Sequence, residues 1–203
     1  MLRKDSEVKK PHLNPPLGKG RCRRGIPFLT LITVFLIAAY AVDCLAQPVA
    51  LDGATAEVYF SPNGGCTDAI VAEIGKAKNE VLVQAYSFTS APIADALVEA
   101  HMRGLNVEVI LDKSQAEKKY SSADFVSYAG IATLIDRNHA IAHNKIILID
   151  RQTIITGSFN FSKAAEEKNA ENLLVIKGSK ELAGRYNENF QKHLEHSVEY
   201  GGQ

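Results

Sequence analysis

The chain has 203 residues and a formal net charge of zero, with 23 basic and 23 acidic side chains. Residues 1–46 carry eight of the basic and three of the acidic residues, so the remaining 157 residues hold fifteen basic and twenty acidic ones, a net charge of −5. This balance excludes binding to nucleic acid by overall attraction. An enzyme acting on nucleic acid would need a local basic patch.

Residues 1–46 have the composition of an export signal. A basic stretch precedes fifteen largely apolar residues, Phe28 to Val42, and Cys44-Leu45-Ala46 follows. This pattern is typical of a secretory signal peptide, so we expect cleavage after Ala46 and a periplasmic or secreted protein. The alternative is an uncleaved membrane anchor, but the apolar run is shorter than the roughly 20 residues of a spanning helix.

Residues 47–203 have the length of one domain with its own core. Of the three cysteines only Cys66 lies in this part, so the mature chain has no internal disulfide. We expect a buried or incidental thiol there, because no histidine or basic partner is close in sequence.

Strand-like and helix-like segments alternate along residues 57–194, which indicates an α/β fold. A polar stretch at 113–128 is interpreted as a loop with short helical turns and a candidate substrate rim. Asn144 to Ile149 is apolar on both faces, as central strands are. The other predicted strands are 57–60, 81–86, 107–111, 131–135, 153–156 and 173–176, and the predicted helices are 67–78, 93–103 and 181–194.

A short run of polar residues carries the functional signal. In the run from His143 to Asp150, His143 and Lys145 are two residues apart and leave the same face of a strand. Ser158 and Asn160 repeat this spacing after the next strand and turn. An imidazole, a cation, a hydroxyl and an amide then converge on one anionic group, for which phosphate is the natural candidate.

These residues resemble the signature of the phospholipase D superfamily, His-x-Lys-x4-Asp followed by Gly-Ser-x-Asn. The chain is most similar to the short bacterial endonucleases that carry one copy, and the similarity extends over roughly residues 58–190, including Tyr86-Ser87-Phe88-Thr89. The resemblance implies a mixed central β-sheet flanked by helices on both faces, with one motif per chain. It also implies that a homodimer completes the active site.

The resemblance also implies a role for each matching residue. His143 would attack phosphorus and form a phosphohistidine, while the same histidine of a second subunit protonates the leaving oxygen. Lys145 and Asn160, helped by Ser158, would hold the nonbridging phosphate oxygens. Glu171 matches the acidic residue that accepts a hydrogen bond from the histidine ring.

Asp150 belongs to the signature and so to the candidate catalytic set, but its spacing argues for a structural role. Seven strand residues place it roughly 23 Å from His143, and the odd spacing sends it to the opposite face. We therefore expect it to cap the turn or to pair with a nearby cation.

Lys113, Lys163 and His139 are expected to contact the substrate. For His139 the alternative, which is at least equally favoured, is a solvated histidine in a loop. His193 and His196 lie in the last helix, where we expect surface roles. Further lysines and one arginine could contact a phosphate backbone along the groove of the dimer: Lys118, Lys119, Arg151 and Lys168.

No metal and no cofactor are expected. The region of the motifs offers no Asp-x-Asp or His-x-His pattern for a two-metal site, and Glu166-Glu167 beside Lys163 and Lys168 reads as a solvated helix face. Activity should therefore persist in a chelator.

The sequence therefore predicts a secreted, metal-independent phosphodiesterase, most simply a non-specific endonuclease acting on DNA and possibly on RNA. A phospholipase or cardiolipin-type hydrolase is the alternative, and it would need an apolar entrance or an interfacial helix. A catalytically inactive relative that only binds nucleic acid is a third reading. Contact with a membrane is expected only through an uncleaved leader.

Overall fold

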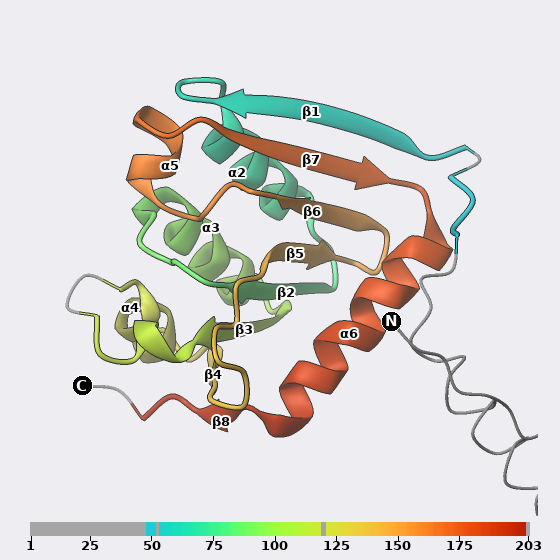
Figure 1. The fold of residues 1–203 in the computed structure, drawn as a ribbon. Coiled ribbons are helices and arrows are strands. Elements are labelled where there is room, and N and C mark those ends of the chain that lie inside the picture. Colours follow the sequence, from blue (N-terminus) through green and yellow to red (C-terminus); the bar gives the residue numbers. More distant parts are fainter. Residues whose placement is uncertain (1–47, 52, 119–120, 202–203) are drawn as a thin grey trace, which may run out of the picture. The chain divides into compact units, whose positions relative to one another are not determined.

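A central β-sheet with helices on both faces forms the fold (Figure 1). The computed structural model describes residues 48–51, 53–118 and 121–201. The predicted signal peptide lies outside these residues, and its cleavage stays a prediction. Among the helices in the described ranges, none is long and apolar enough to cross a bilayer.

Within the described residues the sheet has eight strands in the order β1-β7-β6-β5-β2-β3-β4-β8. β2, β3 and β4 run parallel, and the other neighbouring pairs are antiparallel, which confirms a mixed sheet. The strands are β1 Thr55–Ser61, β2 Glu80–Ala85, β3 Asn106–Asp112, β4 Ala132–Asp136, β5 Lys145–Ile149, β6 Thr153–Gly157, β7 Glu171–Lys177 and β8 Val198–Glu199.

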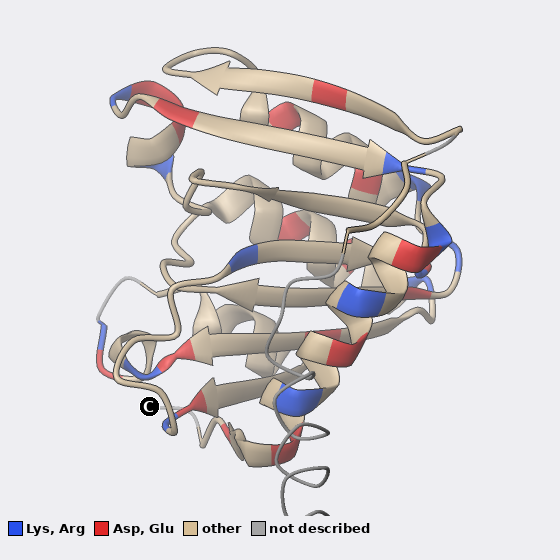
Figure 2. Ribbon diagram, turned by 45° about the vertical axis from the view of Figure 1, so that its right-hand side comes forward, with Lys and Arg blue, Asp and Glu red and all other residues tan. Residues whose placement is uncertain are grey.

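The helices α2 (Cys66–Lys76) and α3 (Ala91–Met102) cover one face of the sheet, and α6 (Lys180–His196) crosses the other (Figure 1). α4 (Ala123–Tyr128) follows a 3-10 turn at Lys113–Gln115, so the predicted loop with short helical turns is confirmed. Acidic and basic residues alternate along α6 (Figure 2), which gives this helix no stripe of one charge.

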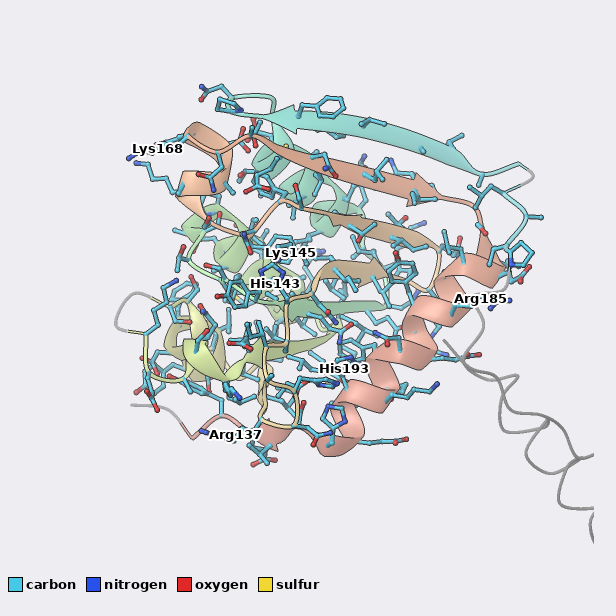
Figure 3. All side chains as sticks on the ribbon, viewed as in Figure 1. Arg137, His143, Lys145, Lys168, Arg185 and His193 are labelled. Atoms are coloured by element: carbon cyan, nitrogen blue, oxygen red, sulfur yellow. The ribbon has the colours of Figure 1, made fainter. Side chains whose placement is uncertain are left out.

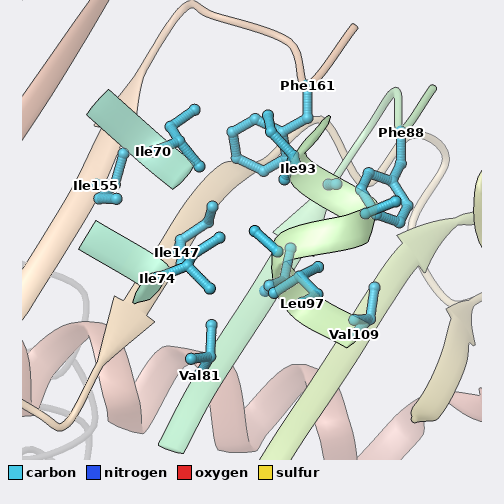
Figure 4. Packing of buried hydrophobic residues seen from close by; sticks show 14 of the residues in the cluster. Ile70, Ile74, Val81, Phe88, Ile93, Leu97, Val109, Ile147, Ile155 and Phe161 are labelled. Carbon is cyan, nitrogen blue, oxygen red and sulfur yellow. The ribbon is translucent and has the colours of Figure 1, made fainter. Parts of the chain in front are cut away.

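The alternation of side chains along the strands builds two apolar layers. Ile147 of β5 packs in the larger layer beneath α2 and α3 (Figure 4), whereas Leu148 packs against α6. β5 is therefore buried on both faces, as predicted for a central strand.

Cys66 is fully buried in the larger layer, and this burial raises the pKa of its thiol to about 11. The expectation of a buried thiol is confirmed.

Two short elements were not predicted, β8 and the helix α5 (Lys163–Glu167). The hydroxyl of Ser162 begins α5 by accepting from the Ala165 N–H at 3.2 Å. Of the two glutamates that were expected on a solvated helix face, Glu167 is exposed, whereas Glu166 is half-buried. Its carboxylate accepts from the N–H groups of Gly65 at 3.1 Å and Thr67 at 2.7 Å, at the start of α2.

Candidate active site

Both motifs meet at one edge of the sheet, which we call the site edge. Here β2 ends at Ala85 opposite Lys145, the first residue of β5. β6 ends at this edge with Gly157, and β7 begins there with Glu171. In an antiparallel pair one strand begins beside the point where its neighbour ends. The turn after β6 and the segment before β5 therefore lie side by side.

His143 and Lys145 are in direct contact at the site edge (Figure 3). Lys145 Nζ lies 3.2 Å from Nδ1 and 3.4 Å from Nε2 of the imidazole, and it donates to the His143 carbonyl at 2.9 Å. The Tyr86 ring packs on the imidazole with centroids 4.3 Å apart. His143 is exposed while Lys145 is only 8% exposed, so an accessible nucleophile lies over a buried cation.

Burial sets the electrostatics of Lys145. Loss of solvent lowers the pKa of its ammonium, and the negative charge of Glu171 opposes that change. In the described chain the Lys145 ammonium has hydrogen-bond contacts to His143 alone. An anionic phosphate group would supply a negative charge in direct contact with the ammonium, whereas Glu171 acts on it without a hydrogen bond in the described chain.

The Gly-Ser-x-Asn turn is held against β7 by backbone contacts. The N–H groups of Ser158 and Phe159 both donate to the carbonyl of Asn172, at 3.1 and 3.2 Å. The Ser158 hydroxyl accepts from the Asn172 N–H at 3.0 Å. A side chain on Gly157 would overlap the Asn172 carbonyl, so glycine is required for this close approach.

Asn160 has an unsatisfied polar atom at the site edge. Its Oδ1 is buried and accepts no hydrogen bond from the described residues. Phe159 and Phe161 on either side are buried in the core, whereas Ser158 is exposed and Asn160 is half-buried. An unpaired amide oxygen costs roughly 1–3 kcal/mol, which a substrate or a second chain could recover by bringing a donor.

Glu171 lies close enough to Lys145 to influence its pKa. Its Oε1 accepts from the Asn169 side chain at 3.2 Å. No hydrogen bond joins Glu171 to His143 within the described part of one chain. The expected bond to a histidine ring stays a prediction for the assembled site.

Comparison with known proteins decides the family. The family described as "Cardiolipin synthase, PLD-like domain" matches residues 70–194. The chain belongs to the phospholipase D superfamily. A phospholipase D of Rickettsia felis is 44% identical over 131 residues, which are 64% of this chain and 65% of that relative. The chain thus spans about two thirds of that relative's length.

Two solved structures of similar proteins share the fold. Nuc from Salmonella typhimurium, a phospholipase D family member, is 36% identical with a TM-score of 0.70, covering 72% of this chain and 98% of that one. NucT from Helicobacter pylori is 26% identical with a TM-score of 0.67, covering 72% and 99%. The α/β fold expected from the superfamily resemblance is confirmed.

Asp150, the last residue of the superfamily signature, lies at the far end of β5 from the site edge. Its carboxylate accepts from three backbone N–H groups, those of Lys78 at 2.9 Å, Asn79 at 2.8 Å and Glu80 at 3.0 Å. Burial raises the pKa of Asp150, but these donors outweigh it and hold the pKa below its usual value. The geometry agrees with the structural role expected from its spacing.

Replacing Asp150 by alanine should lower stability without removing a reacting group. The loss of three bonds to a carboxylate should cost about 2–4 kcal/mol, a fall in Tm of roughly 5–15 °C in a thermal melt. The stabilisation is present at neutral pH and is lost as the pH falls through the lowered pKa. Asp150→Asn tolerates the local φ of 52° and keeps one acceptor, so a smaller fall is expected.

The same Asp150 variants, assayed well below their Tm, should turn over substrate at the wild-type rate. If the Asp150→Asn enzyme were slower than the wild type but melted at the same temperature, Asp150 would have a catalytic role and the structural assignment would be wrong.

The predicted basic contacts lie in different places. Lys113 is exposed and donates to the His139 carbonyl at 3.1 Å, and Lys163 lies at the start of α5, 3.5 Å from Glu167. Lys118 reaches the Ser87 hydroxyl at 3.4 Å, close to the site edge. Arg151 lies in the β5–β6 turn at the opposite edge, so its predicted place along the groove is wrong.

His139 does not join His143 in this structure. Its ring lies 2.8 Å from Asp136, a fully buried carboxylate that His193 and His196 also contact, at 2.8 and 3.2 Å. The side chains of His193 and His196 are 14% and 27% exposed, so the expectation of surface roles is wrong. The prediction of a substrate contact by His139 remains untested.

Proposed function

We propose that this protein is a secreted phosphodiester hydrolase that cuts DNA with little sequence preference and needs no metal for the reaction. The observation that carries the proposal is the exposed His143 imidazole over the buried Lys145 ammonium, beside the Gly-Ser-x-Asn turn. An attacking nitrogen and a fixed positive charge are what a negatively charged phosphodiester requires.

The reaction proceeds in two displacements. One nitrogen of His143 attacks phosphorus, the bond to the leaving oxygen breaks, and a protonated imidazole gives its proton to that oxygen. Water then attacks the phosphohistidine while the second imidazole, now neutral, takes the water proton. The products are an alcohol and a phosphate monoester, and both imidazoles return to their first states.

The second imidazole must come from elsewhere, which supports a homodimer. In the described chain no other histidine ring contacts His143, because His139, His193 and His196 gather around Asp136. A twofold axis beside the site edge would bring a second His143 into the same site. The two rings would then titrate as a coupled pair.

DNA is the preferred substrate for three reasons. The chain resembles the short single-motif endonucleases, its structural neighbours carry the names Nuc and NucT, and exposed Lys113, Lys118 and Lys163 could bind phosphates without reading bases. Phospholipid is the second candidate. The Rickettsia relative is named phospholipase D, and the apolar Ile141 is 59% exposed two residues before His143.

Two parallel assays choose between these substrates. The purified protein is incubated with supercoiled plasmid and, separately, with vesicles of phosphatidylcholine and cardiolipin, both in excess EDTA. We expect nicked and linear plasmid and no lipid turnover. Lipid turnover without nicking would reverse the assignment, and plasmid bound but uncut would support the inactive relative.

A further inference from the structure

Four potential metal ligands converge beside the C-terminal end of α6, in what we call the histidine cluster: Asp136, His139, His193 and His196. Their donor atoms all lie within 4.8 Å of one another. Two strands, β2 and β3, separate β4 from β5. Three strand spacings make roughly 14 Å, so the cluster is distinct from the His143 site. Figure 3 labels His193 on α6, apart from His143 and Lys145.

The cluster is built on regular structure. Asp136 is the last residue of β4, and His139 follows three residues later in the β4–β5 loop. His193 and His196 share one face in the final turn of α6, again three residues apart. Pairing of β8 with β4 fixes the chain just beyond α6. Short pairs of ligands separated by a long stretch are the usual arrangement of a zinc site.

The carboxylate is oriented for single-oxygen ligation. Asp136 Oδ1 accepts the backbone N–H groups of Asn138 at 3.0 Å and His139 at 3.2 Å. Oδ2 is left facing all three imidazoles, at 2.8, 2.8 and 3.2 Å. In a tetrahedral zinc site the donor atoms stand about 3.3 Å apart, so small side-chain movements would admit an ion. Backbone support of a ligand in this way is the usual outer shell of a metal site.

We propose that the histidine cluster binds one Zn²⁺ ion with four protein ligands. Three imidazole nitrogens and one carboxylate suit Zn²⁺, whereas Mg²⁺ and Ca²⁺ prefer oxygen ligands. Neutral imidazoles need only move their proton to the outer ring nitrogen, which frees the inner lone pair for the metal. The ion would also balance the charge of a carboxylate that is 0% exposed.

The role of the ion would be structural. Four protein ligands leave no open position for water or substrate, which is typical of a structural zinc. The ion would join the end of α6 to the loop that leads from β4 to His143. Lys113 already holds the same loop through the His139 carbonyl, and Asp112 Oδ2 accepts from the Ala142 N–H at 2.7 Å. Zinc would therefore stiffen the segment that presents the nucleophile.

Metal binding by the tag-free wild-type chain is the direct test. The protein is stripped with chelator, freed of chelator and titrated with Zn²⁺, and metal is measured by atomic emission after desalting. We expect one zinc per chain and a rise in Tm of about 5 °C or more at saturating metal. Co²⁺ should give the visible absorption of a tetrahedral site, and Zn²⁺ should displace it. These readouts do not depend on any enzymatic activity.

Variants locate the ion. His193→Ala combined with His196→Ala should reduce the stoichiometry from one to zero and abolish the Tm shift. The matched controls His101→Ala, outside the cluster, and His143→Ala should keep one zinc. Absence of zinc and cobalt binding by the wild type overturns the proposal. Retention of zinc by the double variant, or its loss in His143→Ala, also overturns it.

Discussion

Replacement of His143 by alanine is expected to lower the rate of phosphodiester cleavage at least ~10³-fold, because it removes the imidazole that attacks phosphorus in the proposed reaction. The fold should be unaffected, since the side chain is exposed and, among the described residues, its hydrogen-bond and ring contacts are to Lys145 and Tyr86. Initial rates of plasmid nicking, with a thermal melt of the same sample, measure both effects. An alanine variant that cuts at the wild-type rate would remove His143 from the mechanism.

Mixed dimers test whether two subunits share one site. If wild-type and His143→Ala chains are co-expressed in equal amounts and pair at random, about one quarter of the dimers carry two histidines. At the same total protein concentration, the activity of the mixture should then be about one quarter of that of the pure wild type. A fall to only one half would mean that each chain works alone, and the proposed twofold site would be wrong.

The sequence predicted the long elements and the motif residues, because each leaves a local pattern. An apolar run that continues on both faces identified β5, and the two-residue spacing placed His143 and Lys145 together, as the 3.2 Å contact shows. The seven-residue spacing also separated Asp150 from the reacting end of β5. These predictions required only strand geometry, which acts over a few residues.

The features that escaped prediction depend on contacts distant in sequence. Asp136 at the end of β4 and His193 in α6 are 57 residues apart, and no local pattern shows that this strand and this helix meet, which depends on the pairing of β8 with β4. The repeated three-residue spacing of the cluster was visible in the sequence and was the signal that could have found it. Glu166 escaped for the same reason, because its partners at the start of α2 lie 99 and 101 residues away.

Lys145 illustrates a conflict between stability and function. The side chain enters an apolar strand, is 8% exposed, and its burial lowers the pKa of the ammonium. Lys177 shows the opposite change in pKa. It ends β7, at the far end of that strand from Glu171. The hydrogen bond that Lys177 donates to Glu73 raises the pKa of the Lys177 ammonium, and the Glu73 and Glu57 carboxylates lie 2.8 and 3.0 Å from it. The buried Lys145 lacks a close carboxylate partner, whereas the half-buried Lys177 has two, so removal of the two charges should have opposite effects on stability.

Lys145→Met should therefore slow cleavage while leaving the protein as stable as the wild type or more so. Loss of a fixed positive charge beside the transferring phosphoryl group should cost about 10²–10³ in rate. Methionine keeps the shape of the side chain and removes the desolvation penalty, a gain on the order of 1 kcal/mol. Rates of plasmid nicking and a denaturant titration measure the two effects on one preparation.

Lys177→Met is the matched control, with the same substitution in a strand of the same sheet. It breaks two ion pairs and leaves the 8% exposed Glu73 with Lys76 as its remaining cation, so stability should fall while the cleavage rate stays at the wild-type value. If Lys145→Met unfolds at lower denaturant than the wild type, the buried ammonium is a stabilising group in the free protein. Phosphate binding would then not be needed to explain why this lysine is buried.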